Sequence, residues 1–310
     1  MSGLTLHPTG VFANQAAPTR HIEVRPHAAA MGAEICGVSI ADLSDEAFAE
    51  IEAALFRHKM IYFRDQRITH ADQEVFSRRF GPFAEDAYTD GVTGHRNVQP
   101  LIVEADQTVG MIFGAGWHTD SPFLPQPPAI SMLYAAEVPP YGGDTIWANA
   151  VLAYETLSDT MKAMLAPLRV RMSMGRVVET AQACQAPDET PLGKVAATRG
   201  LAKLPEAIAK KVEGRTHPLV RTHPVTGEKA LYIDKTYTAG IEGLTPAEAA
   251  PLIGFLVEHL TQPAFTCRLR WAPGTYVCWD NRICVHQAFN DYQGFRRELY
   301  RTTIAGEIPA

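Results

Sequence analysis

Basic charge is scarce in this chain. Its 28 lysines and arginines are outnumbered by 34 aspartates and glutamates, which gives a formal net charge of −6 at pH 7 with histidine neutral. No block of lysine and arginine is long enough to act as a phosphate-binding arm, and binding to nucleic acid depends on such charge. A nucleic-acid partner is therefore excluded.

Long apolar runs and paired cysteines are absent as well. No stretch of about 18 apolar residues could span a bilayer, and the first twenty residues lack the basic and apolar regions of a signal peptide. The five cysteines are scattered and form no CxxC pair, which argues against a disulfide framework or a zinc ribbon. These absences predict a cytoplasmic protein with no membrane partner, and they leave a homo-oligomer open.

What the chain does have is an alternation of helical and strand-like patterns. Apolar spacing predicts helices over 45–59, 70–81 and 151–165, and a fourth over 245–260 begins with a Thr-Pro-Ala-Glu capping box. Short β-rich runs fill the middle and the C-terminal third. We therefore expect a mainly β fold, an antiparallel sandwich with flanking helices.

The same patterns predict one domain over residues 21–310, preceded by a flexible N-terminal tail over 1–20. Two segments with weak patterns, near 82–115 and 172–215, are candidates for lids, because loops of this length in a compact domain are usually functional or mobile. The first of them contains one run, LIVEA at 101–105, that predicts a buried strand.

The stretch GWHTDSPF, residues 116–123, places two polar side chains in small and apolar surroundings. In a strand, His118 and Asp120 would project from the same face. One explanation is a buried histidine held by a neighbouring carboxylate. The alternative is two ligands of a metal site whose third ligand lies far away in sequence.

His286 is the best third ligand among the eleven histidines, because it lies in the apolar β-rich run ICVHQAF, where an unpaired polar group costs free energy. Two histidines and one carboxylate on one face of a metal leave three positions open, as in non-haem Fe(II) oxygenases. A 2-oxo acid and dioxygen could fill those positions. A zinc hydrolase can use the same ligands, so the three residues alone leave the metal open.

Eleven residues after His286 comes Arg297, and Arg301 follows four residues later. On a strand these arginines share a face, roughly 13 Å apart. An inward-facing arginine is a fork suited to a carboxylate or a sulfonate. The alternative is an exposed, charged strand.

Several motifs, in order and correctly spaced, resemble the taurine dioxygenase/2,4-dichlorophenoxyacetate dioxygenase (TauD/TfdA) family of Fe(II)- and 2-oxoglutarate-dependent oxygenases. The resemblance runs from about residue 32 to residue 306, and its specific parts are SRRFGP, WHTDSPF, GGDT, HPLVRTHP, WDNR, HQAFNDY and RRELYRTTIAG.

The resemblance implies a double-stranded β-helix, or jelly roll, and a role for each matching residue. His118, Asp120 and His286 match the iron ligands. Arg297 matches the arginine that binds the distal carboxylate of 2-oxoglutarate, with Thr145 of the GGDT motif assisting. Arg301 matches the arginine that receives the acidic head of the substrate.

The chain departs from the taurine-cleaving members of the family at two positions. Where those members have particular polar residues, this chain has Asp86 and Gly114. An aryloxyalkanoate or alkylsulfonate is thus a better expectation than taurine, with Phe83, Tyr88, Ile112 and Phe113 as contributors to the pocket. The implied reaction is hydroxylation, with cleavage where the attacked carbon bears oxygen or sulfur, and release of succinate and CO2. The remaining alternatives are a zinc-dependent hydrolase and a non-catalytic jelly-roll binding protein.

Overall fold

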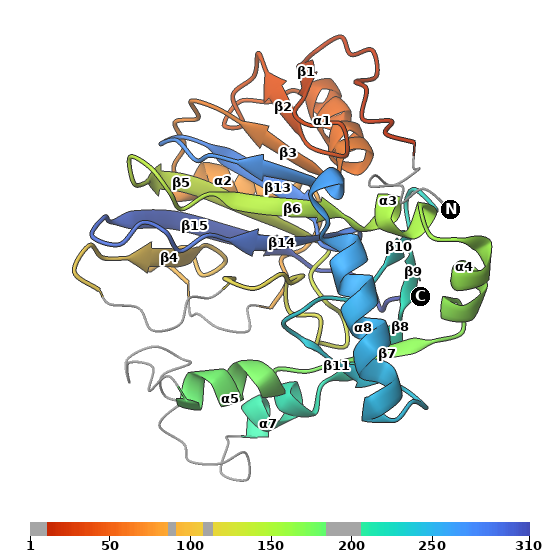
Figure 1. Ribbon diagram of the computed structural model, residues 1–310. Helices are drawn as coiled ribbons and strands as arrows, with labels where there is room; N and C mark the ends of the chain where they lie inside the picture. Colours follow the sequence, from red (N-terminus) through yellow and green to blue (C-terminus); the bar gives the residue numbers. More distant parts are fainter. Residues whose placement is uncertain (1–10, 86–90, 108–113, 184–205) are drawn as a thin grey trace.

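The computed structural model describes residues 11–85, 91–107, 114–183 and 206–310. Its largest element is a seven-stranded sheet, which crosses the molecule in Figure 1. The strands lie in the order β1 (Glu23–Pro26), β2 (Ala33–Cys36), β3 (Met60–Phe63), β13 (Tyr276–Asp280), β5 (Ile130–Glu137), β15 (Arg297–Ile304) and β4 (Gln99–Val103). All neighbouring strands are antiparallel except β2 and β3, which are parallel.

A second sheet packs against the first and completes the predicted sandwich. It contains β12 (Thr266–Leu269), β6 (Thr145–Asn149) and β14 (Cys284–Ala288), with β6 in the centre. The rings of Trp147 and Trp279, one from each sheet, meet at 5.9 Å between centroids and are almost fully buried. Successive strand residues face opposite sides, so Val277 and Trp279 enter this interior while Tyr276 and Cys278 enter the core on the other face of the large sheet.

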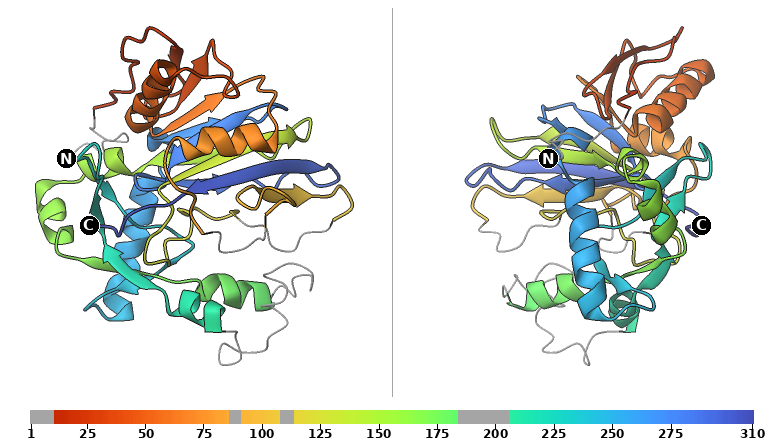
Figure 2. Two further views of the ribbon diagram at one scale, coloured as in Figure 1. Left: turned by 180° about the vertical axis from the view of Figure 1, so that it is seen from behind. Right: turned by 45° about the vertical axis from the view of Figure 1, so that its right-hand side comes forward.

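Helices α1 (Asp45–His58) and α2 (His70–Arg78) cover that other face (Figure 2). Ser44 caps α1, and a capping box of Thr69 and Asp72 begins α2. Both helices were predicted from their apolar spacing, and their N-terminal caps agree with it. Their apolar faces bury Phe48, Leu55 and Phe76 against the sheet.

The remaining elements pack around the other end of the sandwich, where α8 (Pro246–Leu260) contacts α3 (Ala150–Glu155). The predicted single helix over 151–165 is wrong: α3 ends, and Ser158 caps a separate helix, α4 (Asp159–Leu165). The small elements of this region are β7 (Arg169–Met172), α5 (Gly175–Ala183), α7 (Glu206–Glu213), β8 (Arg215–Pro218), β9 (Val220–Thr222), β10 (Lys229–Leu231), β11 (Thr238–Ile241) and a 3-10 turn (Pro263–Phe265).

The predicted tail and lids are described only in part. Residues 11–20 contact the domain through Asn14, whose side chain bonds to His58 Nδ1 at 2.6 Å. The strand predicted at 101–105 is β4, which begins at Gln99 and lies at the sheet edge, half exposed rather than buried. Parts of both lid segments, 86–90, 108–113 and 184–205, lie outside the described residues. None of the described helices is long and apolar enough to cross a membrane.

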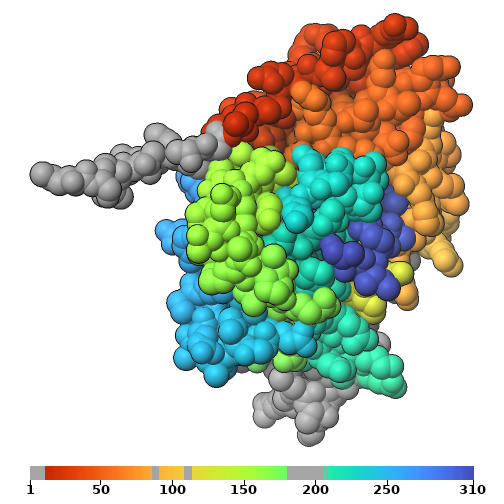
Figure 3. Space-filling view, turned by 90° about the vertical axis from the view of Figure 1, so that its right-hand side faces the viewer, coloured from red at the N-terminus to blue at the C-terminus, as the bar shows by residue number. Residues whose placement is uncertain are grey.

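A buried ionic network fixes the turn after β13. Asp280 is fully buried and accepts two hydrogen bonds from the guanidinium of Arg282, at 2.8 and 2.6 Å, and a third from its backbone N–H at 2.9 Å. His223 Nε2 lies 3.0 Å from the same carboxylate, and its Nδ1 accepts from the backbone N–H of Thr226, so Nε2 carries the proton. Glu307 pairs with Arg282, and the C-terminal residues lie beside the segment that carries His223 (Figure 3).

We expect Asp280→Asn to lower the free energy of unfolding by about 3–5 kcal/mol, because the buried Arg282 loses its hydrogen-bonded charge partner and keeps only the longer contact with Glu307. Burial opposes ionisation of Asp280, but Arg282 and His223 outweigh it and lower the pKa of Asp280. The stability gained from this carboxylate is therefore complete above the ordinary pKa near about 4 and declines as the pH falls below it.

Urea unfolding of the two proteins between neutral and acidic pH tests this, and the difference should shrink as the pH falls. Asp45→Asn is the control, since Asp45 pairs with Arg79 while almost fully exposed and such pairs contribute at most about 1 kcal/mol. Equal losses in the two variants would contradict the role of Asp280.

Candidate metal centre and anion sites

Two of the predicted ligands are joined through the backbone. The N–H of His118 donates to the carbonyl of His286 at 2.9 Å, and the N–H of His286 donates back to the carbonyl of His118 at 2.7 Å. This isolated bridge pairs His118 with β14 at the edge opposite β6 and places the two rings 4.1 Å apart between centroids. The predicted strand through 118–120 is wrong: only His118 is bridged, and the chain then turns, with Ser121 in the left-handed region at φ 44°.

The turn still brings Asp120 to the two histidines. Asp120 Oδ1 lies 3.8 Å from His118 Nε2 and 3.9 Å from His286 Nε2, and the three side chains are all buried. Their donor atoms lie within 4.8 Å of one another, the arrangement expected of ligands around one ion. In the described part of the chain no other group of three such side chains comes this close.

The protonation states fit a divalent metal. His118 Nδ1 lies 2.8 Å from the carbonyl of Gly116 and must donate to it, so Nε2 keeps its lone pair for a metal. Burial, reinforced by His118, lowers the pKa of His286 to about 3, so this imidazole is neutral. Burial opposes ionisation of Asp120, but His286, Arg301 and His118 hold its pKa below the ordinary value. Two imidazole Nε2 atoms and a carboxylate thus face one point.

Residues 234–238 hold the segment that carries His118, and sequence analysis missed them. The backbone N–H groups of Lys235 and Thr236 both donate to the carbonyl of Trp117 at 3.2 Å. The buried carboxyl group of Asp234 accepts from the N–H of Thr119 at 3.3 Å, and burial raises the pKa of Asp234 to about 6. The run ALYIDKTY resembles an ordinary strand, so only its folded neighbours reveal this contact.

Arg297 lies buried between two aromatic rings. Its guanidinium carbon is 5.9 Å from the centroid of Trp271 and 5.6 Å from that of Tyr292. Its Nη2 donates to the carbonyl of Gly143 at 3.2 Å, whereas its Nε has no hydrogen-bond partner in the described structure. Burial lowers the pKa of Arg297. A buried guanidinium with donors left over and no ion pair among the described residues is suited to bind an anion.

Thr145 lies beside this arginine at the start of β6. Its Oγ accepts a hydrogen bond from Trp271 Nε1 at 3.0 Å. Because an indole N–H can only donate, the hydroxyl proton of Thr145 remains available for an acceptor. Thr145 and Arg297 thus both contact Trp271 and can contribute donors to one anion.

Arg301 shares the inward face of β15 with Arg297. Tyr300 faces the opposite side and packs on His70, with ring centroids 4.4 Å apart. Arg296 faces that side too, and pairs with Glu104, Glu137 and Glu298. Arg301 Nη1 lies 3.8 Å from Asp120 Oδ1, so this guanidinium is directed toward the carboxylate of the candidate metal centre rather than toward solvent.

The expected contributors to the substrate pocket have different outcomes. Phe83 is half-buried and packs against the core on the helix-covered face of the large sheet, with Arg78 over its ring at 5.1 Å, and so does not line the site. Asp86, Tyr88, Ile112 and Phe113 lie outside the described residues. Gly114 has φ +80°, and a Cβ there would lie 3.2 Å from His118 Cε1.

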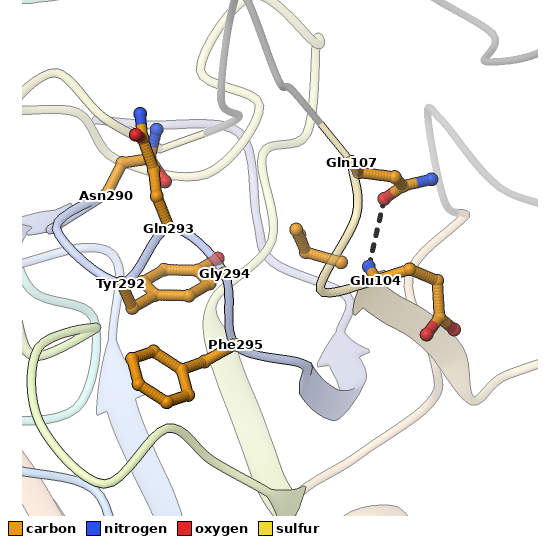
Figure 4. A pocket seen from close by; sticks show the side chains of 8 residues that line it. Glu104, Gln107, Asn290, Tyr292, Gln293, Gly294 and Phe295 are labelled. Carbon is orange, nitrogen blue, oxygen red and sulfur yellow. Dashed lines mark hydrogen bonds between the residues drawn. The ribbon is translucent and has the colours of Figure 1, made fainter.

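A small cavity lies beside Tyr292, between the loop 290–295 and the residues that follow β4 (Figure 4). The side chain of Gln107 closes one wall by accepting from the N–H of Glu104 at 3.0 Å. The cavity volume is about 20 Å³, which is room for one water molecule and too little for an organic ligand.

Known proteins share this architecture. The model of the taurine catabolism dioxygenase TauD, TfdA family matches residues 23–303. The chain is 34% identical to an alpha-ketoglutarate-dependent sulfate ester dioxygenase from Pseudomonas putida, over 93% of this chain and 91% of the relative. It is 32% identical to an (S)-phenoxypropionate/alpha-ketoglutarate-dioxygenase from Sphingobium herbicidovorans, over 92% of this chain and 95% of the relative.

Solved structures agree. The crystal structure of a taurine dioxygenase from Burkholderia xenovorans has a TM-score of 0.75 at 35% identity, covering 94% of this chain and 93% of that one. AAD-2 in complex with Mn(II) and N-oxalylglycine has a TM-score of 0.73 at 26% identity, covering 93% and 98%. The predicted jelly-roll fold and enzyme class are confirmed. The chain belongs to the TauD/TfdA family of 2-oxoglutarate-dependent dioxygenases.

Proposed function

We propose that this protein is an Fe(II)-dependent member of the family, with iron held by His118, Asp120 and His286. The observation that carries the proposal is the combination of this buried donor set with the buried guanidinium of Arg297, whose Nε lacks a partner among the described residues. A zinc-dependent hydrolase would need only the three metal ligands, and a non-catalytic binding protein would need neither feature. Neither class of protein requires a second, buried anion site.

The cosubstrate 2-oxoglutarate has two carboxylates, and the chain offers separate places for its two ends. Arg297 and Thr145 would bind the distal carboxylate, because both present donors beside Trp271. The 2-oxo acid end would then reach the metal positions that the three protein ligands leave open. Iron and 2-oxoglutarate would supply the oxidising chemistry, in which dioxygen is consumed and succinate, CO2 and a hydroxylated substrate are released.

Arg301 would orient the substrate by its acidic head group. Its side chain is only 15% exposed, so a bound anion would be held largely out of water, where charge-assisted hydrogen bonds are strong. We infer a carboxylate, sulfonate or sulfate ester with an apolar body, such as an aryloxyalkanoate or alkylsulfonate. The names of the two relatives, acting on a sulfate ester and a phenoxypropionate, support this class.

His118→Ala should abolish substrate-dependent succinate formation, because two remaining ligands cannot hold iron in the required geometry. His27→Ala is the control: it also removes an imidazole, but from a site next to Tyr62. Succinate release and Fe(II) binding under anaerobic conditions are the measurements. Full activity of His118→Ala with added iron would refute the metal assignment.

Arg297→Ala should weaken 2-oxoglutarate binding by about 2–5 kcal/mol, the range for removing one partner of a buried charge pair. Arg297→Lys should rescue poorly, because a point charge cannot reproduce the planar fork. Arg296→Ala, at the adjacent outward-facing position, should leave the affinity unchanged. The affinity is measured by calorimetric titration of the metal-loaded protein with 2-oxoglutarate. Equal affinity in wild type and Arg297→Ala would contradict this role of Arg297.

Arg301→Ala should strongly raise the KM for an anionic substrate while leaving the KM for the cosubstrate nearly unchanged, since the two anions use different arginines. Arg297→Ala should show the reverse pattern. The measurement is succinate release with taurine, an aryloxyalkanoate, an alkylsulfonate and an alkyl sulfate. Taurine as the preferred substrate would show that the substrate class is wrong.

A further inference from the structure

The two carboxylate oxygens of Asp120 have different surroundings. Oδ1 faces the Nε2 atoms of His118 and His286, at 3.8 and 3.9 Å. Oδ2 forms a short hydrogen bond with the hydroxyl group of Ser131, a fully buried residue of β5. Only one oxygen is therefore directed at the point where the three ligands meet.

The direction of the hydrogen bonds behind Ser131 follows from their chemistry. Trp279 Nε1 can only donate, and it donates to Asn281 Oδ1 at 2.8 Å. This fixes which end of the Asn281 amide is oxygen, so Nδ2 donates to Ser131 Oγ, also at 2.8 Å. With its oxygen already accepting, Ser131 has its single proton left for Asp120 Oδ2. We call this chain of hydrogen bonds, from Trp279 through Asn281 and Ser131 to Asp120, the relay. Every donor in it points the same way, from the indole to the carboxylate.

Strands of the large sheet hold the relay residues in place. Ser131 and Trp279 are directly opposite each other in the β5–β13 register. The backbone N–H of Asn281 donates to the carbonyl of Ala129 at 2.8 Å, and the carbonyl of Asn281 accepts from Thr119 Oγ1 at 2.8 Å. Ser131, Trp279 and Asn281 are each at most 2% exposed, so water cannot replace their hydrogen bonds.

We propose that Trp279, Asn281 and Ser131 are positioning residues that keep Asp120 a one-oxygen ligand, with Oδ2 occupied and Oδ1 presented to the metal. The proposal rests on the proposed function. A carboxylate that bound through both oxygens would fill a fourth coordination position, and the facial arrangement needs three left open for a two-point cosubstrate and dioxygen. The relay thus keeps these positions free without touching the metal.

Cobalt(II) is the probe, because its visible absorption reports coordination number in the absence of turnover. Ser131→Ala should weaken Co(II) binding about 10- to 100-fold, the usual effect of removing a residue that orients a metal ligand, and should change the spectrum. Ser131→Thr keeps the hydroxyl group and should restore both. Trp279→Phe removes the indole N–H and should shift affinity in the same direction by less.

Ser77→Ala is the matched control. Ser77 is also fully buried and hydrogen-bonds Thr302 Oγ1 at 2.7 Å and Tyr276 OH at 3.3 Å, but away from the ligands. Its thermal unfolding midpoint should fall as that of Ser131→Ala does, while its Co(II) affinity and spectrum stay those of wild type. If Ser131→Ala does not fold, the Co(II) affinity and spectrum of Trp279→Phe are compared with those of Ser131→Thr and wild type instead.

The outcomes separate the two proposals. Wild-type Co(II) affinity and spectrum in folded Ser131→Ala, or in Trp279→Phe where Ser131→Ala does not fold, would overturn the relay and leave the metal site intact. Co(II) binding that His118→Ala does not weaken would instead refute the metal site itself. Loss of affinity in Ser131→Ala with rescue by Ser131→Thr would support the relay.

Discussion

Two backbone hydrogen bonds between His118 and His286 bring the candidate metal ligands together. They join a turn before β5 to a strand of the smaller sheet, and they need no side chain to do so. Once this pairing forms, Asp120 is two residues from one end of it, and Arg301 Nη1 lies 3.8 Å from Asp120 Oδ1. The ligands therefore meet because the two sheets pack, and the core around Trp147 and Trp279 supports the chemistry indirectly.

The buried charges of this domain differ in how completely they are satisfied. Asp280 has Arg282 and His223, and removing Arg282 would leave a buried carboxylate without a charge partner. Arg297 has one carbonyl and two aromatic rings, with Nε unpaired among the described residues. Burial costs both groups hydration, but only Asp280 recovers it within the described structure. The contrast distinguishes a network that stabilises the fold from a guanidinium held ready for a ligand.

Sequence patterns predicted what depends on local spacing. Helices α1 and α2 were found from their apolar periodicity, and the shared face of Arg297 and Arg301 follows from the period of a strand. The break between α3 and α4 was missed, since the cap at Ser158 interrupts a continuous apolar pattern. Ser131 and Asp234 were also missed. Each resembles an ordinary strand residue, and its role exists only once tertiary contacts form.

Position 114 constrains the loop that precedes the candidate metal centre. The backbone there is left-handed, at φ +80°, a conformation that glycine and asparagine adopt most readily. The glycine of this chain therefore adopts this conformation without strain. A Cβ at this position would nevertheless lie 3.2 Å from His118 Cε1. A side chain at 114 would therefore have to be accommodated by a shift of the His118 ring.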